Sequence, residues 1–571
     1  MFHQLLASLV AIALVGCAAD PQQRAQTTAA PPPSAIASFD IIIAHAKIVD
    51  GTGSPWFYGD VAINAGKIAQ VGNLGQATAK LLIDAKGKVV SPGFIDVHTH
   101  ADDDLYKLPH AENFIRDGVT TIVVGNCGYG VRDVRTYFDN LETRGVAVNV
   151  ATLYGHNTIL RAVKGNVRGD LTPDQMGQAR ALLDQAMRDG AVGLSTGLIY
   201  TPGQWSSTEE IIELAKVSAK YGGIYASHMR SEGGSIMEAI DEALRIGKES
   251  GCRVQISHFK IASDYAKKVG GSDATLARVM EARNAGVEVW VDQYPYTASS
   301  TTLSTLMPDW VLEKGNDEAV KILSDETQLQ KVLADMKDTY ETRRGKTSMK
   351  YAVIASQEKH PEYVGKNLEQ VARLRKYGKE AELLRDAASG EAVTMEDQYR
   401  AAIAIFLDGG ASCVFHSMDE ENVANILKHP LVAIASDAGV REFGSGQPHP
   451  RGYGTNARVL GRYARELKLI TLEDAVRKMT GLPATAFRFH NRGLLQPGFA
   501  ADVVIFDADK VIDKSTFDAP HAYSEGFDYV IVNGQLVVND GKLTGTLPGQ
   551  PIFGPGRTLS SRAPGPIQIQ N

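Results

Sequence analysis

The segment SPGFIDVHTH, residues 91–100, begins a long stretch in which strand-like and helix-like segments alternate. Runs rich in β-branched residues, such as TTIVVGNCG (120–128) and RVQISHFK (253–260), are separated by helical segments such as TPDQMGQARALLDQAMRDG (172–190). Repeated strand–helix units in one continuous stretch favour a parallel sheet, and about eight of them close into a barrel. We therefore expect an α/β fold in which residues 93–490 form a (β/α)8 TIM-like barrel.

Two further β-like runs, YAVIAS (351–356) and SCVFHS (411–416), exceed the number of strands that such a barrel needs. The neighbouring stretch 311–410 is charged and has a mainly helical pattern. We expect this stretch to be an insertion between the seventh and eighth strands, placed as a lid beside the barrel mouth.

Both flanks of the barrel segment contain short apolar strands separated by glycine-containing turns, such as FDIIIAHAKIVDG (39–51) and ADVVIFD (501–507). The same pattern of short strands and turns at both ends predicts one small β-sandwich domain built from residues 39–92 and 491–545. The last segment, 546–571, is expected to be a C-terminal tail.

The composition excludes several classes of protein. The 571 residues have a net charge of −7 and no basic run, which argues against a nucleic-acid partner. No apolar run reaches the roughly 20 residues of a membrane-spanning helix. Four cysteines are too few for a disulfide scaffold in a chain of this length. The sequence leaves the oligomeric state open.

The N-terminus predicts export. An apolar run over residues 5–15 has the length of a signal-peptide core, and LVGC (14–17) resembles the bacterial lipobox, in which the cysteine is lipidated. We expect residues 1–17 to be a lipoprotein signal peptide with Cys17 as the lipidation site, and 18–38 to be a flexible linker. A plain secretory signal is the alternative, because no Lys or Arg precedes the run. The expected location is the bacterial cell envelope, facing the periplasm, with the lipid anchor as the only membrane contact.

Polar side chains follow the predicted barrel strands, and in such barrels the working residues lie at the C-terminal strand ends. His98 and His100 are two residues apart in one strand, so they share a face and can bind one divalent metal. Asp437 ends the last strand, where a carboxylate can accept a proton from metal-bound water and pass it on. The structural alternatives are two exposed histidines and a helix or turn cap.

Three more strand ends carry candidate metal ligands. Cys127 in GNCG can supply a thiolate, and His228 and His258, each in a Ser-His pair, can supply imidazoles, which zinc prefers. Lys260 lies on the same face as His258 and can present an ammonium group to an anionic substrate. The alternatives are a buried structural cysteine, core histidines and a solvated lysine.

In their order along the chain, SPGFIDVHTH, GNCG, SHMR, SHFK and SDAG resemble the motifs of the amidohydrolase superfamily. The longer motifs GLSTGLIYTPG, GGIYASHMRSEG, DQYPYTASST and HPRGYGTNARVLGRY resemble N-acyl-D-amino-acid deacylases (D-aminoacylases), and the resemblance covers about residues 39–545. It implies a zinc-dependent hydrolase, with one or two divalent ions, that acts on a small-molecule N-acyl-D-amino acid. The products would be a carboxylate and a free D-amino acid.

The resemblance also implies roles for the metal ligands. Cys127, His228 and His258 would hold the tighter metal, and His98 with His100 would belong to a second site. The fourth strand, GLSTGL, offers no lysine for a bridging carbamate, and the cysteine would take its place as the bridge.

A carboxylate clamp is implied in the same way. It carries over to Lys260, to Tyr294 of QYPY and to Arg451 of HPRGYG, with Ser300 as a further member. Tyr296 is one strand step from Tyr294 and is the alternative tyrosine.

The sequence defines the type of reaction more closely than it defines the substrate. The motif after the catalytic strand is Asp437-Ala438-Gly439 instead of the usual Asp-Gly, and the loop to Arg451 is longer. A related amidohydrolase acting on a dipeptide or a cyclic amide is the alternative function, although a cyclic amide does not need a carboxylate clamp. A non-catalytic envelope lipoprotein is a third hypothesis, against which the complete ligand set argues.

Overall fold

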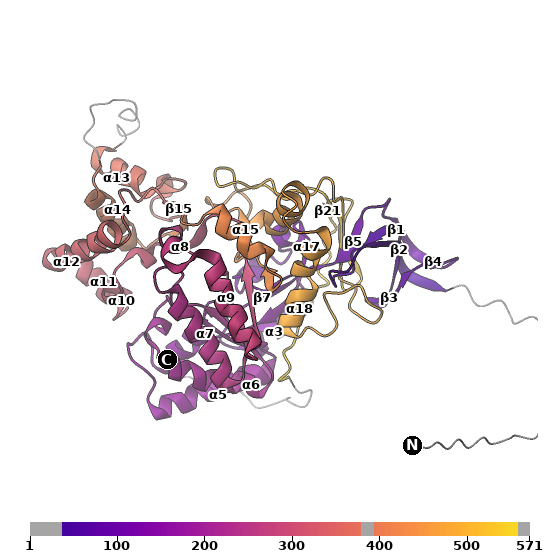
Figure 1. The fold of residues 1–571 in the computed structure, drawn as a ribbon, viewed down its shortest axis with the longest axis horizontal. Coiled ribbons are helices and arrows are strands. Elements are labelled where there is room, and N and C mark those ends of the chain that lie inside the picture. The colour runs from indigo at the N-terminus through magenta and orange to yellow at the C-terminus, as the bar shows by residue number, and fades with distance from the viewer. Residues whose placement is uncertain (1–36, 379–392, 558–571) are drawn as a thin grey trace, which may run out of the picture.

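The computed structural model describes residues 37–378 and 393–557 (Figure 1). A central barrel separates a β-domain on one side from a helical insertion on the opposite side. The predicted signal peptide, its Cys17 and nearly all of the predicted linker lie outside the described residues. Among the described residues, no helix has both the length and the apolar composition that crossing a membrane requires.

The barrel wall consists of short parallel strands. In order they are β6 (Phe94–Asp96), β7 (Val119–Val124), β8 (Asn149–Thr152) with β9 (Tyr154–Gly155), β10 (Gly193–Gly197), β11 (Ile224–His228), β12 (Arg253–Ile256), β13 (Val289–Gln293) and β17 (Val432–Ile434).

Two junctions turn these strands into a closed ring. Only Leu153 separates β8 from β9, and its N–H donates to the carbonyl of Val124 at 2.9 Å, so β8 and β9 act as one interrupted strand. At the other junction the N–H of Asp437 donates to the carbonyl of His98, and the N–H of His100 donates to that of Ala438, both at 2.9 Å. With β8 and β9 counted as one strand, the described part of the barrel has eight strands, and the predicted (β/α)8 barrel is confirmed.

Helices cover the outside of the barrel, and α5 (Pro173–Asp189) shows why they form where they do. Thr172 and Gln175 make a reciprocal capping box at its start, and Gly190 in a left-handed conformation (φ 113°) ends it. Its buried residues recur at helical spacing, so one face packs against the barrel. The other main covering helices are α3 (Val134–Arg144), α6 (Thr208–Lys220), α7 (Ile236–Ser250), α9 (Gly271–Asn284), α15 (Glu420–Lys428) and α17 (Leu472–Met479).

The small β-domain is one nine-stranded sheet built from both ends of the chain. In its long strand β1 (Ser38–Ile48), the pairing with β2 shifts register between Ile43 and Ala46. On its other edge, β1 pairs with β4 before this irregularity and with β5 after it. The folded sheet encloses an apolar cluster that contains Ile43, so it forms the predicted β-sandwich. Its other strands are β2 (Phe57–Asn64), β3 (Lys67–Gly72), β4 (Thr78–Asp84), β5 (Val89–Pro92), β18 (Val503–Phe506), β19 (Phe527–Val532), β20 (Gln535–Asn539) and β21 (Lys542–Leu543).

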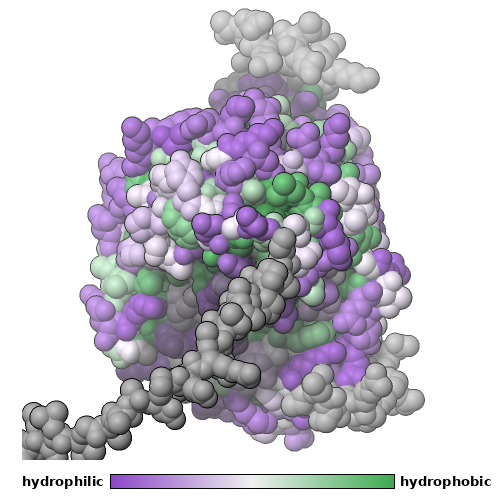
Figure 2. All heavy atoms as spheres, turned by 90° about the vertical axis from the view of Figure 1, so that its right-hand side faces the viewer, coloured by the Kyte–Doolittle hydropathy of each residue, from purple (hydrophilic) through white to green (hydrophobic). Residues whose placement is uncertain are grey.

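Figure 2 shows this side of the molecule, where hydrophilic and hydrophobic residues are intermixed on the surface. Tyr58 of β2 and Leu82 of β4 are among the exposed apolar residues of the β-domain, at 72% and 66% exposure. Single exposed apolar residues are normal on a folded protein, and we assign them no role.

The segment between β13 and β17 leaves the barrel and folds around a hydrophobic cluster of its own. It contains a three-stranded sheet of β14 (Ser299–Thr302), β16 (Ser412–Phe415) and β15 (Ala352–Ser356), which accounts for the two extra β-like runs. It is longer than the predicted 311–410, because β14 has no apolar alternation that would mark it as a strand. Its main helices are α11 (Asn316–Ser324), α12 (Glu326–Lys337), α13 (Leu368–Tyr377) and α14 (Met395–Leu407).

The described part of the predicted C-terminal tail packs against the barrel. Pro548 forms a parallel bridge with Val146, and the N–H of Ile552 donates to the carbonyl of Val150 at 2.8 Å. The ring of Phe553 packs edge-on against Phe138. A proline- and glycine-rich segment held mainly by backbone bonds has no periodicity, which is why the sequence gives no sign of this packing.

Phe94 offers a test of the contact between the barrel and the β-domain. Its fully buried ring packs against Phe506 and Phe527 of the β-domain, with centroids 6.4 and 6.1 Å away. We expect Phe94→Ala to lower the free energy of unfolding by about 3–5 kcal/mol, because the substitution leaves a cavity. Urea unfolding followed by tryptophan fluorescence measures this loss. Phe443→Ala, at a ring that is 52% exposed, is the control, and equal midpoints for the two variants would contradict the prediction.

Candidate metal centre and active site

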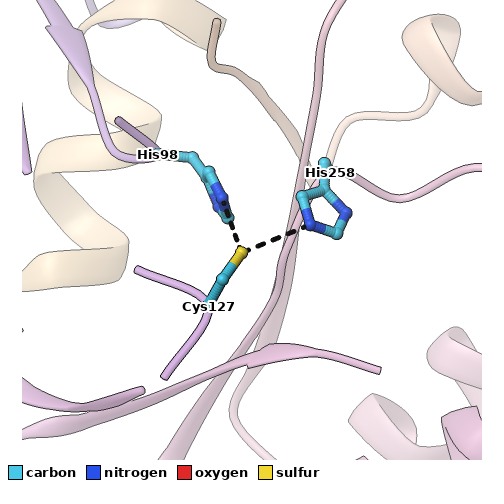
Figure 3. Close-up of side chains that lie close together, drawn as sticks. All are labelled: His98, Cys127 and His258. Carbon is cyan, nitrogen blue, oxygen red and sulfur yellow. Dashed lines mark hydrogen bonds between the residues drawn. The ribbon is translucent and has the colours of Figure 1, made fainter. Parts of the chain in front are cut away.

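One thiol and three imidazoles meet at the C-terminal ends of the barrel strands. The Sγ of Cys127 lies 3.4 Å from Nε2 of His98, 3.6 Å from Nδ1 of His228 and 3.7 Å from Nε2 of His258. Figure 3 shows Cys127 pointing between His98 and His258. These side chains come from the ends of four different strands, so the fold brings together residues that are far apart in the sequence.

The spacing of these atoms fits a tetrahedral zinc ion. With bonds of about 2.3 Å to sulfur and about 2.0–2.1 Å to nitrogen, a tetrahedral angle places sulfur and nitrogen about 3.6 Å apart. The three observed separations of 3.4, 3.6 and 3.7 Å lie close to this value. One thiol and three imidazoles are also a donor set that zinc prefers over magnesium or calcium.

Burial prepares the imidazoles for this role. It lowers the pKa of His98, His228 and His258 well below the ordinary value, so each ring is neutral and keeps a lone pair for a metal. Burial raises the pKa of the Cys127 thiol, so a thiolate needs a nearby cation to form.

A second group of ligand atoms adjoins the first. Asp437 Oδ1 lies 3.1 Å from Nε2 of His100 and 3.6 Å from Nε2 of His98. His98 therefore belongs to both groups: one with Cys127 and His258, the other with His100 and Asp437. The resemblance had placed His98 only with His100, but here its Nε2 is within reach of either position.

Three site residues have an unusual backbone conformation. Cys127, His258 and Asp437 adopt positive φ angles of 55°, 37° and 53°, a region that residues other than glycine rarely occupy. Each follows the end of a barrel strand, where the turn directs its side chain over the barrel mouth. Such conformations cost about 1–3 kcal/mol each and cluster at functional sites, which supports a chemical role for this strand edge.

Asp437 is held in its ionised form. Burial raises its pKa, but Arg451, with Nη1 2.9 Å from Oδ2, and the neighbouring histidines together outweigh burial and hold the pKa well below its usual range. Nε2 of His100 makes a further polar contact with the same carboxylate. At neutral pH this group is a carboxylate that can accept a proton.

The predicted clamp residues lie together beside the imidazoles. The ring of Tyr294 is 5.6 Å from Lys260 Nζ and 4.6 Å from the guanidinium of Arg451, so it stands between the two cations. Nη2 of Arg451 also donates to the Ser300 carbonyl at 3.3 Å. Tyr296 instead packs against Arg458 and Phe517, and of the two tyrosines Tyr294 is therefore the one at the site.

A cavity of about 380 Å³ opens over both groups of ligands. Its lining includes Lys260, Glu232, Ser300 and Asp437 together with Cys127, His100, His228 and His258. The rest of its wall consists of Tyr129, Ile199, Tyr200, Ser299, Thr301 and Thr302.

Comparison with known proteins now identifies the family. Residues 81–538 match the model of the amidohydrolase family. This chain belongs to the amidohydrolase family. It is 35% identical to an N-acyl-D-glutamate deacylase of Alcaligenes xylosoxydans xylosoxydans, covering 87% of this chain and 93% of that one. It is also 35% identical to a D-aminoacylase of the same organism, with coverages of 90% and 97%.

A solved structure supports the same assignment. The N-acyl-D-glutamate deacylase of Bordetella bronchiseptica, complexed with zinc and a phosphonate inhibitor that mimics the tetrahedral intermediate, matches with a TM-score of 0.74. The two proteins are 34% identical, and the match covers 90% of this chain and all of that chain.

Sequence reasoning missed the carboxylates that lie behind the candidate ligands of this amidohydrolase. Glu232 Oε1 accepts from Lys260 Nζ at 2.5 Å and lies 2.9 Å from Nδ1 of His258. Asp292 accepts from the N–H of His258 at 2.7 Å and lies 3.7 Å from Nδ1 of His98. Carboxylates behind metal-binding histidines fix the orientation of the ring. Glu232 follows His228 in SHMRSE, and that position was the available signal.

The cysteine in this amidohydrolase gives a direct test of the metal centre. We expect Cys127→Ala to bind zinc about 10- to 100-fold more weakly or to lose it, because one of the donors around the ion is removed. Zinc content after dialysis, measured by elemental analysis, checks this. Cys252→Ala is the matched control, because Cys252 is also buried and free but its Sγ contacts the Gly223 carbonyl far from the site. Equal zinc content in the two variants would remove Cys127 from the ligand set.

Proposed function

We propose that this amidohydrolase hydrolyses N-acyl-D-amino acids to a carboxylate and a free D-amino acid. The observation that carries the proposal is the ionised Asp437 beside a thiol–imidazole cluster, with Lys260 at the same cavity and Arg451 bound to Asp437. The two relatives described above, a deacylase and a D-aminoacylase, support the same reaction over nearly the whole chain.

We propose zinc as the cofactor, as one or two ions. Cys127, His228 and His258 would hold one ion, His100 and Asp437 would face a second, and His98 can reach either. When bound, zinc supplies Lewis-acid polarisation of the amide carbonyl and a water of lowered pKa.

The chain itself handles the substrate and the protons. Lys260, Tyr294 and Arg451 bind the α-carboxylate of the substrate through the N–H groups of the two cations and the phenol. Asp437 Oδ accepts the proton of the attacking water and then donates it to the nitrogen of the departing amine. Arg451 keeps this carboxylate ionised, which makes it competent for the first of these transfers.

Selection of the D-enantiomer follows from the fixed position of the clamp. With the α-carboxylate bound on one side of the cavity, only one configuration at Cα presents the acyl carbonyl to the metal centre and the side chain to free space. Positioning of this kind contributes to rate as well as to chirality, because misplaced reacting atoms lose the benefit of proximity.

A substrate panel and one substitution test the proposal. The enzyme should hydrolyse N-acetyl-D-amino acids and leave their L-enantiomers, dipeptides and hydantoins nearly untouched. Asp437→Asn should lower kcat about 10²- to 10⁴-fold, because the proton acceptor is lost while the shape is kept. The measurement is release of the free amino acid.

Asp103→Asn is the matched control, since Asp103 is an exposed carboxylate on the loop after β6, and its kcat should stay close to that of the wild type. A wild-type preference for hydantoins or dipeptides would replace the proposal with the alternative amidohydrolase activity. Near-normal kcat in a folded Asp437→Asn enzyme would remove Asp437 from the mechanism.

We also propose that the protein is exported and lipid-anchored through Cys17 in the bacterial cell envelope. The apolar run 5–15 and the LVGC segment support this. In a bacterial host grown with labelled palmitate, the wild type should be labelled and fractionate with membranes, whereas Cys17→Ser should not be labelled. Labelling of Cys17→Ser would contradict the proposal.

A further inference from the structure

A loop connects Asp437 and Arg451, the two partners of the ion pair that the proposed reaction uses. The middle of this loop, residues 442–446, is exposed. Its two ends lie side by side, since a side-chain carbon placed on Gly452 would lie 3.6 Å from Cβ of Ala438. The base of the loop therefore sets how the two charged groups lie relative to each other.

The side chain of Asn113 joins the two ends of this loop. Its Nδ2 donates to the carbonyls of Gly452 and Gly439, at 2.7 and 3.3 Å. Its Oδ1 accepts from the N–H of Arg441 at 3.2 Å. Because a backbone N–H can only donate and a carbonyl can only accept, these partners settle which end of the amide is which. One side chain thus bonds to the backbone on both sides of the loop base.

These bonds act close to the charged groups. Gly439 lies two residues after Asp437. Gly452 directly follows Arg451, whose Nη1 is 2.9 Å from Oδ2 of Asp437. Loss of the bonds from Asn113 would free the backbone on both sides of this ion pair.

Burial and backbone conformation also set Asn113 apart. It is 1% exposed, so water competes little for its amide bonds. It belongs to α2 (Glu112–Ile115), and Ala111, directly before this helix, has a φ of 43°, which a residue other than glycine rarely adopts. The backbone therefore bears a cost beside the segment that carries Asn113 to the loop.

We propose that Asn113 is a positioning residue of the active site. By tying together the two ends of the loop, it holds Arg451 against Asp437 and in place for the α-carboxylate of the substrate. Asn113 is not among the described residues that line the cavity, so it acts through Arg451 and does not touch the substrate. This inference rests on the deacylase function proposed above.

Asn113→Ala in the zinc-loaded enzyme tests the inference. We expect KM to rise and kcat/KM for N-acetyl-D-amino acids to fall at least about tenfold, because a small displacement of a positioned group costs both binding and rate. Asn113→Ser keeps one donor and should lie between the alanine variant and the wild type. The zinc content of both variants should equal that of the wild type, because no candidate ligand is changed.

Asn149→Ala is the matched control. Asn149 is also fully buried, and its Nδ2 donates to the Thr120 carbonyl while its Oδ1 accepts from the N–H of Gln550, both at 3.1 Å. It begins β8, at the end of the barrel opposite the site. This variant should lower the melting temperature and yet leave KM and kcat/KM within about twofold of the wild type, because distant sites do not couple.

A double-mutant cycle with Arg451→Lys separates positioning from a general loss of stability. Because Asn113 acts through Arg451, Asn113→Ala should lower kcat/KM much less in the Arg451→Lys enzyme than in the wild type. Equal fold-losses in the two backgrounds would overturn the inference. Unchanged KM and kcat/KM in folded Asn113→Ala or Asn113→Ser would also overturn it.

The outcomes separate this inference from the proposed function. A wild type that hydrolyses N-acetyl-D-amino acids, beside an Asn113→Ala enzyme with the same kinetics, would overturn the inference and leave the deacylase intact. A zinc-loaded wild type that hydrolyses none of these substrates would overturn both.

Discussion

The hydrogen bonds between the end of β17 and the end of β6 are the constraint on which the site depends. The N–H of Asp437 donates to the carbonyl of His98, and the N–H of His100 donates to that of Ala438. These bonds join residues that are more than 300 positions apart in the sequence, and the Asp437 carboxylate lies 3.1 Å from Nε2 of His100. Without this closure Asp437 and the His98–His100 pair would lie at the two free edges of an open sheet.

The closed ring also sets the electrostatics of the site. His98, His228 and His258 are buried, so they stay neutral, while Asp437 stays charged because Arg451 and the polar groups around it outweigh the effect of burial. Burial thus produces the neutral donors for a cation, and the charges beside Asp437 produce the ionised proton acceptor. The positive φ angles at three strand ends show that the backbone bears a cost to bring these groups together.

Much of this could be predicted from the sequence, because strand periodicity and order along the chain carry it. His98 and His100 share a face through their i, i+2 spacing, and Cys127, His228 and His258 each end a β-branched run. Glu232 was missed because it acts from a loop, and β14 because its Ser-Ser-Thr-Thr sequence has no apolar alternation. The packing of residues 546–557 was missed because backbone bonds leave no pattern in the side chains.

The position of the insertion affects how the substrate range of this enzyme could change. The insertion carries β14 to the cavity but folds around its own apolar cluster, whereas the candidate metal ligands all come from barrel strands and the loops that follow them. Among the described residues, the insertion therefore contributes to the cavity wall but supplies none of the candidate metal ligands. Substitutions in the insertion can therefore change the wall of the cavity without replacing a candidate ligand, which favours the emergence of new specificities on one scaffold.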